Sequence, residues 1–149
     1  MLKYDLFNDQ KFPLDEKLIK KVVVAFGRLA DLGKRDYFSL AFVDGRTIRK
    51  WNKAYRGKDK MTDVLSFAQR ESEDMFAGDN RELGEILICF PIAKKQAKEY
   101  GFSLEFEMAR LLVHGLAHLA GYEHEGVSER TAAKMQKFEE KILNVIFPK

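Results

Sequence analysis

The sequence predicts an α/β (α+β) fold in which a small mixed β-sheet packs with helices in a single compact domain spanning residues 1–149. Three observations support this prediction. Strand-like and helix-like segments alternate along the chain, which is typical of a sheet covered by helices. The chain has 149 residues, 46% hydrophobic and 33% charged, enough to bury one core. A long amphipathic segment near the C-terminus has the length of a central helix.

The N-terminal half of the chain predicts two helices and two strands. Apolar residues recur at helical spacing from Leu14 to about Leu32, and Gly33 ends that helix. Residues 37–43 alternate and are rich in aromatic side chains, which indicates a strand. Residues 47–55 predict a short helix. Residues 64–67 predict a strand near the edge of the sheet, because charged loops flank it.

The C-terminal half begins with a predicted loop. Residues 69–82 carry five acids and no apolar rhythm, so we expect a flexible loop that could act as a lid. A strand follows at 83–90, and Pro91 opens a helix that ends at Gly101. The last helix, from residue 128 to about 145, is predicted to turn Met135 toward the core.

The long helix between these segments is predicted to start after Ser103 and to end at Gly121. Its apolar stripe consists of Leu104, Met108, Leu111, Leu112, Gly115, Leu116 and Leu119. At about 100° per residue, His114 and His118 fall just off the edge of this stripe. We therefore expect both histidines at the border between core and solvent, where a cleft can open.

The composition excludes several classes of protein. The one cysteine, Cys89, allows no internal disulfide and no cysteine-rich zinc knuckle, and its apolar neighbours predict a buried, inert thiol. No apolar run reaches the roughly 18 residues that a membrane span needs, and the N-terminus lacks a signal-peptide core. We expect a globular, cytoplasmic protein without a membrane partner.

All three histidines, His114, His118 and His124, fall in one short stretch with the spacing H-x3-H-x5-H. Residues four apart share a helix face, so two imidazoles can converge on one ion with bonds of roughly 2.0–2.1 Å. A third histidine after the helix completes three protein ligands and leaves a coordination position for water. The pattern predicts a hydrolytic site on a central metal-binding helix. Three histidines suit zinc, and they also accept nickel or copper.

The histidine stretch shares the outline of the metzincin protease signature H-E-x-x-H-x-x-G-x-x-H, with one difference. Gly115 stands where the protease has the glutamate that deprotonates the attacking water. A glycine inside a helix costs about 1 kcal/mol relative to alanine, which suggests that another backbone or a substrate approaches closely. Glu107 shares the face but lies too far along the helix to replace the glutamate, so a peptidase is disfavoured.

A basic window precedes the histidines. Residues 46–60 contain Asp59 as their one acid, against Arg46, Arg49, Lys50, Lys53, Arg56, Lys58 and Lys60. Trp51 and Tyr55 lie among these cations and offer flat faces on which bases could stack. Such a run alone is more often a solvated helix face. Beside a hydrolytic metal it favours a polyanionic substrate, because a guanidinium fork matches phosphate geometry.

Three segments together resemble one family. The histidine stretch is similar to H-G-x-x-H-L-x-G-[YF]-[DE]-H, residues 52–67 to N-x-x-[YF]-R…T-[DN]-V-L-S-F, and residues 83–86 to L-G-[DE]-I. These are motifs of the YbeY family of bacterial metal-dependent endoribonucleases. The chain departs from the family pattern at Met61, Ala68, Ala117 and Glu123, none of which is a proposed ligand.

The resemblance implies a specific function. His114, His118 and His124 would bind one zinc ion, and Arg56 aligns with the active-site arginine of the family. The implied activity is that of a single-strand-specific, zinc-dependent endoribonuclease in ribosomal RNA processing, namely small-subunit rRNA 3′ end maturation, and in ribosome quality control. The implied partners are single-stranded RNA, ribosomal RNA and ribosomal particles, with ribosomal proteins as further contacts.

Alternatives stay open at this point. The chain could be a non-catalytic RNA-binding ribosome assembly factor with a structural metal or, less favoured, a metalloprotease. Thr62 and Ser66 could line the cleft or serve only the strand that they open. Water and the RNA 2′-hydroxyl are both compatible nucleophiles.

Overall fold

The computed structural model describes residues 1–69, 81–121 and 128–148. Within these ranges the strands are β1 (Lys3–Phe7), β2 (Asp36–Val43), β3 (Val64–Ala68) and β4 (Arg81–Cys89). They form one sheet in the order β1-β2-β4-β3. β1, β2 and β4 run parallel, whereas β3 pairs with β4 in the antiparallel direction. The predicted mixed sheet is therefore confirmed, with β3 at its edge.

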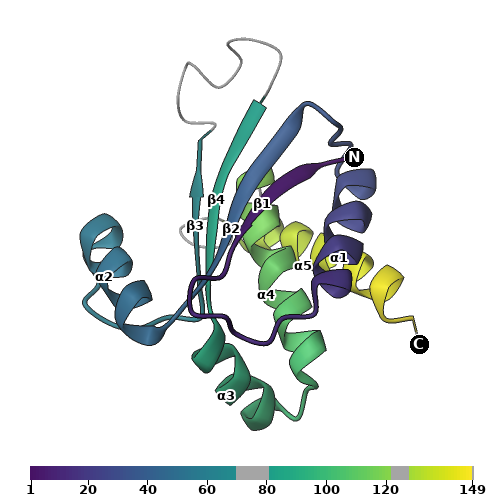
Figure 1. The fold of residues 1–149 in the computed structure, drawn as a ribbon. Helices are drawn as coiled ribbons and strands as arrows, with labels where there is room; N and C mark the ends of the chain where they lie inside the picture. Colours follow the sequence, from purple (N-terminus) through teal and green to yellow (C-terminus); the bar gives the residue numbers. More distant parts are fainter. Residues whose placement is uncertain (70–80, 122–127, 149) are drawn as a thin grey trace.

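The helices of the described ranges cover both faces of the sheet. They are α1 (Glu16–Leu29), α2 (Gly45–Arg56), α3 (Phe90–Tyr100), α4 (Leu104–Ala120) and α5 (Glu129–Ile146). α1, α4 and α5 lie on one face, and α2 stands on the other side of the sheet (Figure 1). α4 contacts the sheet, α1, α3 and α5, which makes it the central helix. Among the described helices, none is long and apolar enough to cross a membrane.

Several predicted boundaries differ from the structure. No strand is predicted for residues 3–7, yet they form β1. The first helix begins at Glu16 rather than Leu14 and ends at Leu29. β4 begins at Arg81, inside the predicted loop, and residues 70–80 of that candidate lid lie outside the described residues. The predicted positions of α3, α4 and α5 are correct to within one or two residues.

The core has one part on each face of the sheet. The larger part packs α1, α4 and α5 against the strands and includes Met135, as predicted. The smaller part lies under α2 and consists of Ile48, Leu65, Leu87 and Cys89. Burial raises the pKa of the Cys89 thiol, which fits the prediction of an inert cysteine.

Polar caps fix the ends of α2 and α4, the two helices nearest the candidate site. Asp44 caps α2, where hydrogen bonds from Gln10 at 2.6 Å and Thr47 at 2.8 Å lower the pKa of its carboxyl to about 2. Ser103 caps α4, as predicted, and accepts from the backbone N–H of Phe106. Gly121 ends α4 in the left-handed conformation, with φ of 113°.

Gly84 in β4 generates the first prediction. Its φ is +138°, and a Cβ at this position would collide with the backbone carbonyl oxygen of Phe67 in β3. We expect Gly84→Ala to lower the free energy of unfolding by about 3 kcal/mol, because conformational strain adds to a clash between two paired strands. Urea unfolding measures this loss.

Gly33→Ala is the matched control, because nothing lies within 4 Å of a Cβ at Gly33. We expect this control to change the stability by less than about 1 kcal/mol. Equal losses in the two variants would contradict the strain assigned to Gly84.

Candidate metal centre and its cleft

α4 brings His114 and His118 together at the border of the core. Their Nε2 atoms lie 3.2 Å apart, and their ring planes are nearly perpendicular, at 89°. Two nitrogens that bind one tetrahedral ion with bonds of about 2.0 Å would be ~3.3 Å apart. The pair therefore has the spacing of two ligands of one metal ion, and the same spacing also permits a hydrogen bond between the rings.

Glu139 of α5 orients the first of these histidines. Its Oε1 lies 2.7 Å from Nδ1 of His114. A hydrogen on Nδ1 that is donated to this carboxylate leaves Nε2, on the side of His118, as the electron-pair donor. Carboxylates commonly stand behind metal-binding histidines in this way. The Nε2 atoms of His114 and His118 therefore fit a zinc ion both in their chemistry and in their spacing.

The third predicted ligand, His124, lies outside the described residues. Across residues 1–69, 81–121 and 128–148, no three His, Cys, Asp or Glu side chains form a group that could hold a metal ion. The left-handed turn at Gly121, which the sequence predicts before His124, is present. The assignment of His124 as a ligand stays a prediction.

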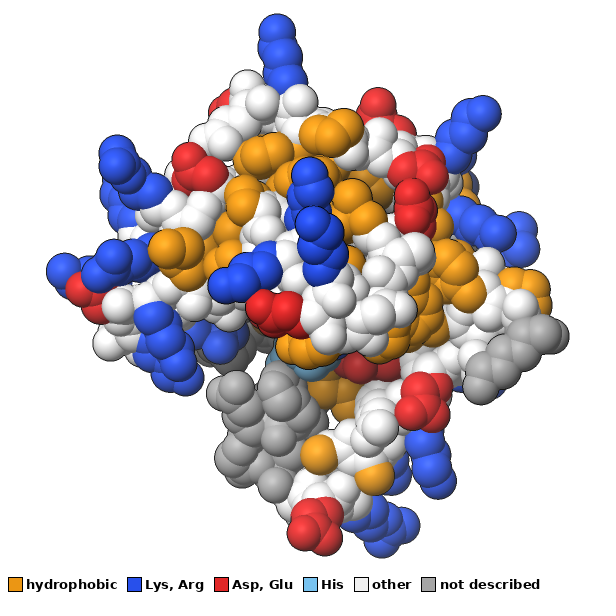
Figure 2. Space-filling view, turned by 90° about the horizontal axis from the view of Figure 1, so that it is seen from below, with side chains coloured by type: hydrophobic (Ala, Val, Ile, Leu, Met, Phe, Trp, Pro, Cys, Tyr) orange, Lys and Arg blue, Asp and Glu red, His pale blue; other side chains and the backbone are white. Residues whose placement is uncertain are grey.

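The two histidines line a cleft with a volume of about 180 Å³. Seen from below, histidine surface is visible inside a recess of the molecule (Figure 2). The cleft is lined from α2, from β3 with the segment before it, and from α4, by Arg56, Thr62, Asp63, Val64, Ser66, Arg110, Leu111, His114 and His118. The structure thus brings Arg56 together with two of the predicted ligands, and Thr62 and Ser66 lie beside them.

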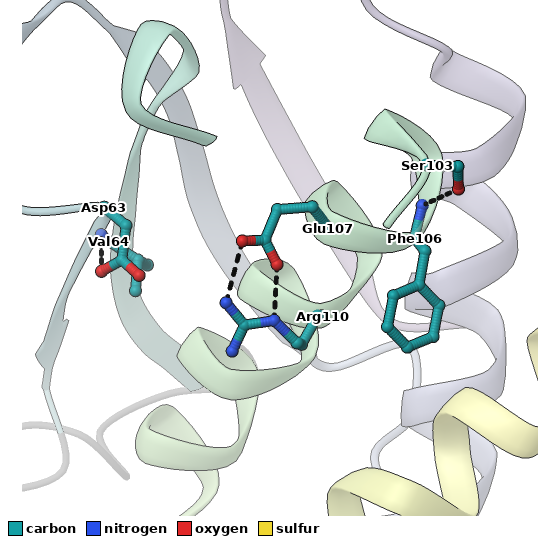
Figure 3. Close-up of polar contacts among 6 residues, drawn as sticks. All are labelled: Asp63, Val64, Ser103, Phe106, Glu107 and Arg110. Carbon is teal, nitrogen blue, oxygen red and sulfur yellow. Dashed lines mark hydrogen bonds and ion pairs between the residues drawn. The ribbon is translucent and has the colours of Figure 1, made fainter. Parts of the chain in front are cut away.

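An ion pair between buried Glu107 and partly exposed Arg110 stands at one wall of the cleft, which Arg110 lines. Glu107 is fully buried, and Arg110 donates from Nε and Nη2 to its two carboxylate oxygens at 2.5 and 2.9 Å (Figure 3). The Gln96 amide, oriented with its nitrogen toward the acids, donates to Glu107 at 3.1 Å and to Asp63 at 3.2 Å. The other oxygen of Asp63 accepts from the backbone N–H of Val64 at 2.8 Å. Glu107 is therefore committed to Arg110, in agreement with the prediction that it does not replace the protease glutamate.

Arg56 differs from Arg49 and Arg110 in having no carboxylate partner among the described residues. Arg49, on the same helix, lies 2.8 Å from Asp59, and Arg110 is paired with Glu107. In the described part of the chain, Arg56 makes no ion pair. Its guanidinium can therefore bind an anion in the cleft through two parallel hydrogen bonds.

Gly115 faces the sheet rather than the cleft. A Cβ at this position would lie 2.9 Å from Cγ2 of Ile86 in β4, so a larger residue fits only if the Ile86 side chain, the helix or the strand shifts. The close neighbour of this glycine is a buried side chain of the sheet, so the expectation of a backbone or a substrate at this place is wrong. A glutamate in the metzincin position would point into the core, which argues against the protease interpretation.

Glu139, Arg110 and Asp63 are residues of the site that the sequence pattern did not single out. Arg110 precedes His114 by four residues, so helical spacing could have placed it beside the histidine. Asp63 falls in the segment that resembles the family motif. Glu139 has no local signal, because it comes from another helix, 25 residues beyond His114.

Comparisons with known proteins agree with this architecture. The profile of the family described as "Endoribonuclease YbeY" matches residues 6–146. A protein named endoribonuclease YbeY from Macrococcus caseolyticus is 40% identical over 143 residues, which cover 93% of this chain and 92% of that protein. One with the same name from Pelotomaculum thermopropionicum is 46% identical over 112 residues, covering 74% of this chain and 72% of that protein.

A solved structure shares the fold. The solution structure of TM1509 from Thermotoga maritima gives a TM-score of 0.64 at 25% sequence identity, and covers 99% of this chain and 89% of that protein. The chain belongs to the YbeY endoribonuclease family, hydrolases that act on RNA.

The contact between Glu139 and His114 generates a prediction on metal affinity. We expect Glu139→Gln to weaken zinc binding by roughly 10- to 100-fold, because a neutral amide neither fixes nor polarises the imidazole as a carboxylate does. Competition with a chromophoric zinc chelator measures the affinity, and thermal melting checks the fold.

Glu140→Gln is the control for this prediction, because the Glu140 carboxylate accepts from Gln136 at 3.3 Å on the exposed side of the same helix. It should bind zinc as the unmodified protein does. A Glu139→Gln variant with the zinc affinity of this control would remove Glu139 from the metal centre.

Proposed function

We propose that this member of the YbeY family is a single-strand-specific, zinc-dependent endoribonuclease that acts in 3′ end maturation of small-subunit ribosomal RNA and in ribosome quality control. The observation that carries the proposal is the placement of Arg56 in one cleft with His114 and His118. Family membership supports RNA as the substrate. The proposed partners are single-stranded RNA, ribosomal RNA and ribosomal particles.

His114, His118 and His124 would hold one zinc ion. Zinc in such a site supplies Lewis acidity, which activates water near neutral pH and polarises a phosphoryl oxygen. The contribution of this chain is to keep the imidazoles in position. Glu139 fixes the tautomer of His114, and the helical spacing sets His118 beside it. Nickel or another divalent ion could occupy the same nitrogens in vitro.

Arg56 supplies the positive charge that phosphodiester cleavage needs. Negative charge increases on the non-bridging oxygens as the bond to the leaving oxygen breaks, so a preorganised donor there stabilises the transition state. A guanidinium can donate to two of these oxygens at once. The Ser66 hydroxyl lines the same cleft and can donate to the same phosphate or to the sugar, whereas the Thr62 hydroxyl donates to Asp63 at 3.4 Å.

The role of Arg56 gives a prediction on turnover. We expect Arg56→Ala to retain bound zinc and to lower the cleavage of single-stranded RNA at least about tenfold, because a charge-stabilising donor is lost from the transition state. Arg56→Lys keeps the charge but not the fork, so it should recover only part of the rate. Single-turnover cleavage of a labelled oligoribonucleotide measures both variants.

The matched control is Arg49→Ala, which removes one cation from the same helix outside the cleft. Its rate should fall by less than about threefold, and the loss should shrink further at high salt. Unchanged turnover in Arg56→Ala would exclude Arg56 from the chemistry.

A second candidate is a non-catalytic RNA-binding assembly factor whose metal is structural. The observation in its favour is that Glu139 and His114 join α5 to α4, so an ion at His114 would also tie these two helices together. The buried Met135 and Ile142 hold the same pair of helices without a metal. The enzyme is therefore the better-supported candidate.

Metal removal separates the two candidates. For the enzyme, we expect a chelator to abolish RNA cleavage while the domain stays folded at 25 °C, and added zinc to restore cleavage. Far-ultraviolet circular dichroism and the cleavage assay are followed on the same sample. Unfolding on chelation, with no metal able to restore cleavage, would instead establish the structural role.

A further inference from the structure

Three aromatic side chains gather outside the cleft, on the α2 side of the sheet. Trp51 and Tyr55, one helical turn apart on α2, stack with ring centroids 5.1 Å apart and planes inclined by 12°. Phe67 of β3 meets Tyr55 edge to face at 5.4 Å. We call Trp51, Tyr55 and Phe67 the aromatic platform. Its outer member, Tyr55, is 64% exposed, and Trp51 is 36% exposed.

Burial accounts for Phe67, which packs against the smaller part of the core, but not for the exposed Tyr55. The apolar contact between α2 and the sheet is made by buried Ile48 with its neighbours in β3 and β4. Tyr55 lies beyond that contact and contributes little to it. Single exposed apolar side chains are common on proteins, but a stacked pair supported by a third ring presents a flat, pre-ordered apolar face.

Neighbouring residues of the edge strand β3 belong to the cleft and to the aromatic platform. Ser66 lines the cleft, whereas the next residue, Phe67, belongs to the platform, because successive side chains of a strand point to opposite faces. The same juxtaposition occurs at the end of α2, where Tyr55 of the platform precedes Arg56 of the cleft. In the described ranges β3 pairs only with β4, and α2 stands beside this edge (Figure 1). An RNA strand that runs out of the cleft past Arg56 would therefore reach the aromatic platform next.

The charge around the platform suits a polyanion. Asp59, the one acid in residues 46–60, is held by Arg49 at 2.8 Å and by Lys53 at 4.0 Å. Lys and Arg side chains project on all sides of the molecule, the side where α2 lies included (Figures 1 and 2). Stacked aromatic faces among cations are the arrangement that binds single-stranded nucleic acid without reading its sequence. An acidic protein partner would use the cations but would not need the planar face.

We propose that Trp51 and Tyr55 form a stacking site for unpaired nucleobases of the RNA strand whose phosphate lies at Arg56. The inference rests on the proposed function for the identity of that strand. In a duplex each base is already stacked between its neighbours and is not available to the platform, so this site would contribute to selection of single strands.

Trp51 is the one tryptophan of the chain, so its fluorescence reports on the platform directly. The protein is titrated with a single-stranded oligoribonucleotide in the presence of a chelator, which prevents cleavage. We expect saturable quenching, and a Kd that rises by roughly 5- to 100-fold in Tyr55→Ala, the range that corresponds to loss of one base–aromatic stack. Tyr55→Phe keeps the ring and should restore the affinity, whereas Tyr55→Leu, apolar but not planar, should not.

Two controls test whether stacking of bases on Tyr55, rather than a general loss of RNA binding, causes the change in Kd. Phe7→Ala removes another exposed aromatic side chain, on β1 at the opposite edge of the sheet, and should leave the Kd unchanged. An oligonucleotide of the same length with abasic sites keeps the phosphates and removes the bases. It should bind the unmodified protein and Tyr55→Ala equally, which closes a double-mutant cycle between Tyr55 and the base.

The outcomes distinguish the two proposals. Equal RNA affinity of Tyr55→Ala and the unmodified protein, with tryptophan fluorescence insensitive to RNA, overturns the stacking site even if zinc-dependent cleavage is observed. Quenching that depends on Tyr55 and on the bases supports the stacking site even if no metal produces cleavage, which would refute the nuclease and not the platform. Equal quenching by duplex and single strand would overturn the role in strand selection.

Discussion

The close approach of α4 to β4 at Gly115 is the contact on which the geometry of the site depends. Because Gly115 has no side chain, α4 packs closely against Ile86. The two histidines of α4 then line one cleft with residues of β3 and with Arg56 at the end of α2. A Cβ at this position would lie 2.9 Å from Cγ2 of Ile86, so the present packing of helix against strand requires a residue without a side chain. The helix propensity lost by a glycine, about 1 kcal/mol, is thus offset by the packing that positions the site.

The charges of the cleft are distributed so that one cation stays available. A carboxylate as deeply buried as that of Glu107 is strongly destabilising without a partner, so Arg110 is needed first to neutralise it. Glu139 faces His114, and Asp63 accepts a backbone hydrogen bond. Within the described part of the cleft, this leaves Arg56 as the arginine without a carboxylate. For this reason Arg56, rather than Arg110 in the same cleft, is the residue to which we assign the phosphate.

Local patterns predicted most of the fold, and tertiary contacts account for what they missed. Caps and glycines located α4 correctly, and the charged flanks of β3 placed it at the edge of the sheet. β1 was missed although Leu2, Tyr4 and Leu6 alternate, because so short a segment becomes a strand only by pairing with β2. Histidine spacing predicted the convergence of His114 and His118. The partner of His114 on α5 and the side chain that meets Gly115 depend on how distant elements pack, which periodicity does not encode.

The arrangement across β3 has a consequence for specificity. Arg56 would contact phosphate, which carries no sequence information, and the platform would contact the faces of bases rather than their edges. A site of this kind separates unpaired from paired strands and treats different sequences alike. If single-stranded ribosomal RNA is the substrate, the cleavage position has then to be set by which segment reaches the cleft. In a sequence-reading nuclease, base-specific contacts choose the cleavage position. Here the ribosomal particle would choose it, through the RNA strand that it leaves unpaired and exposed.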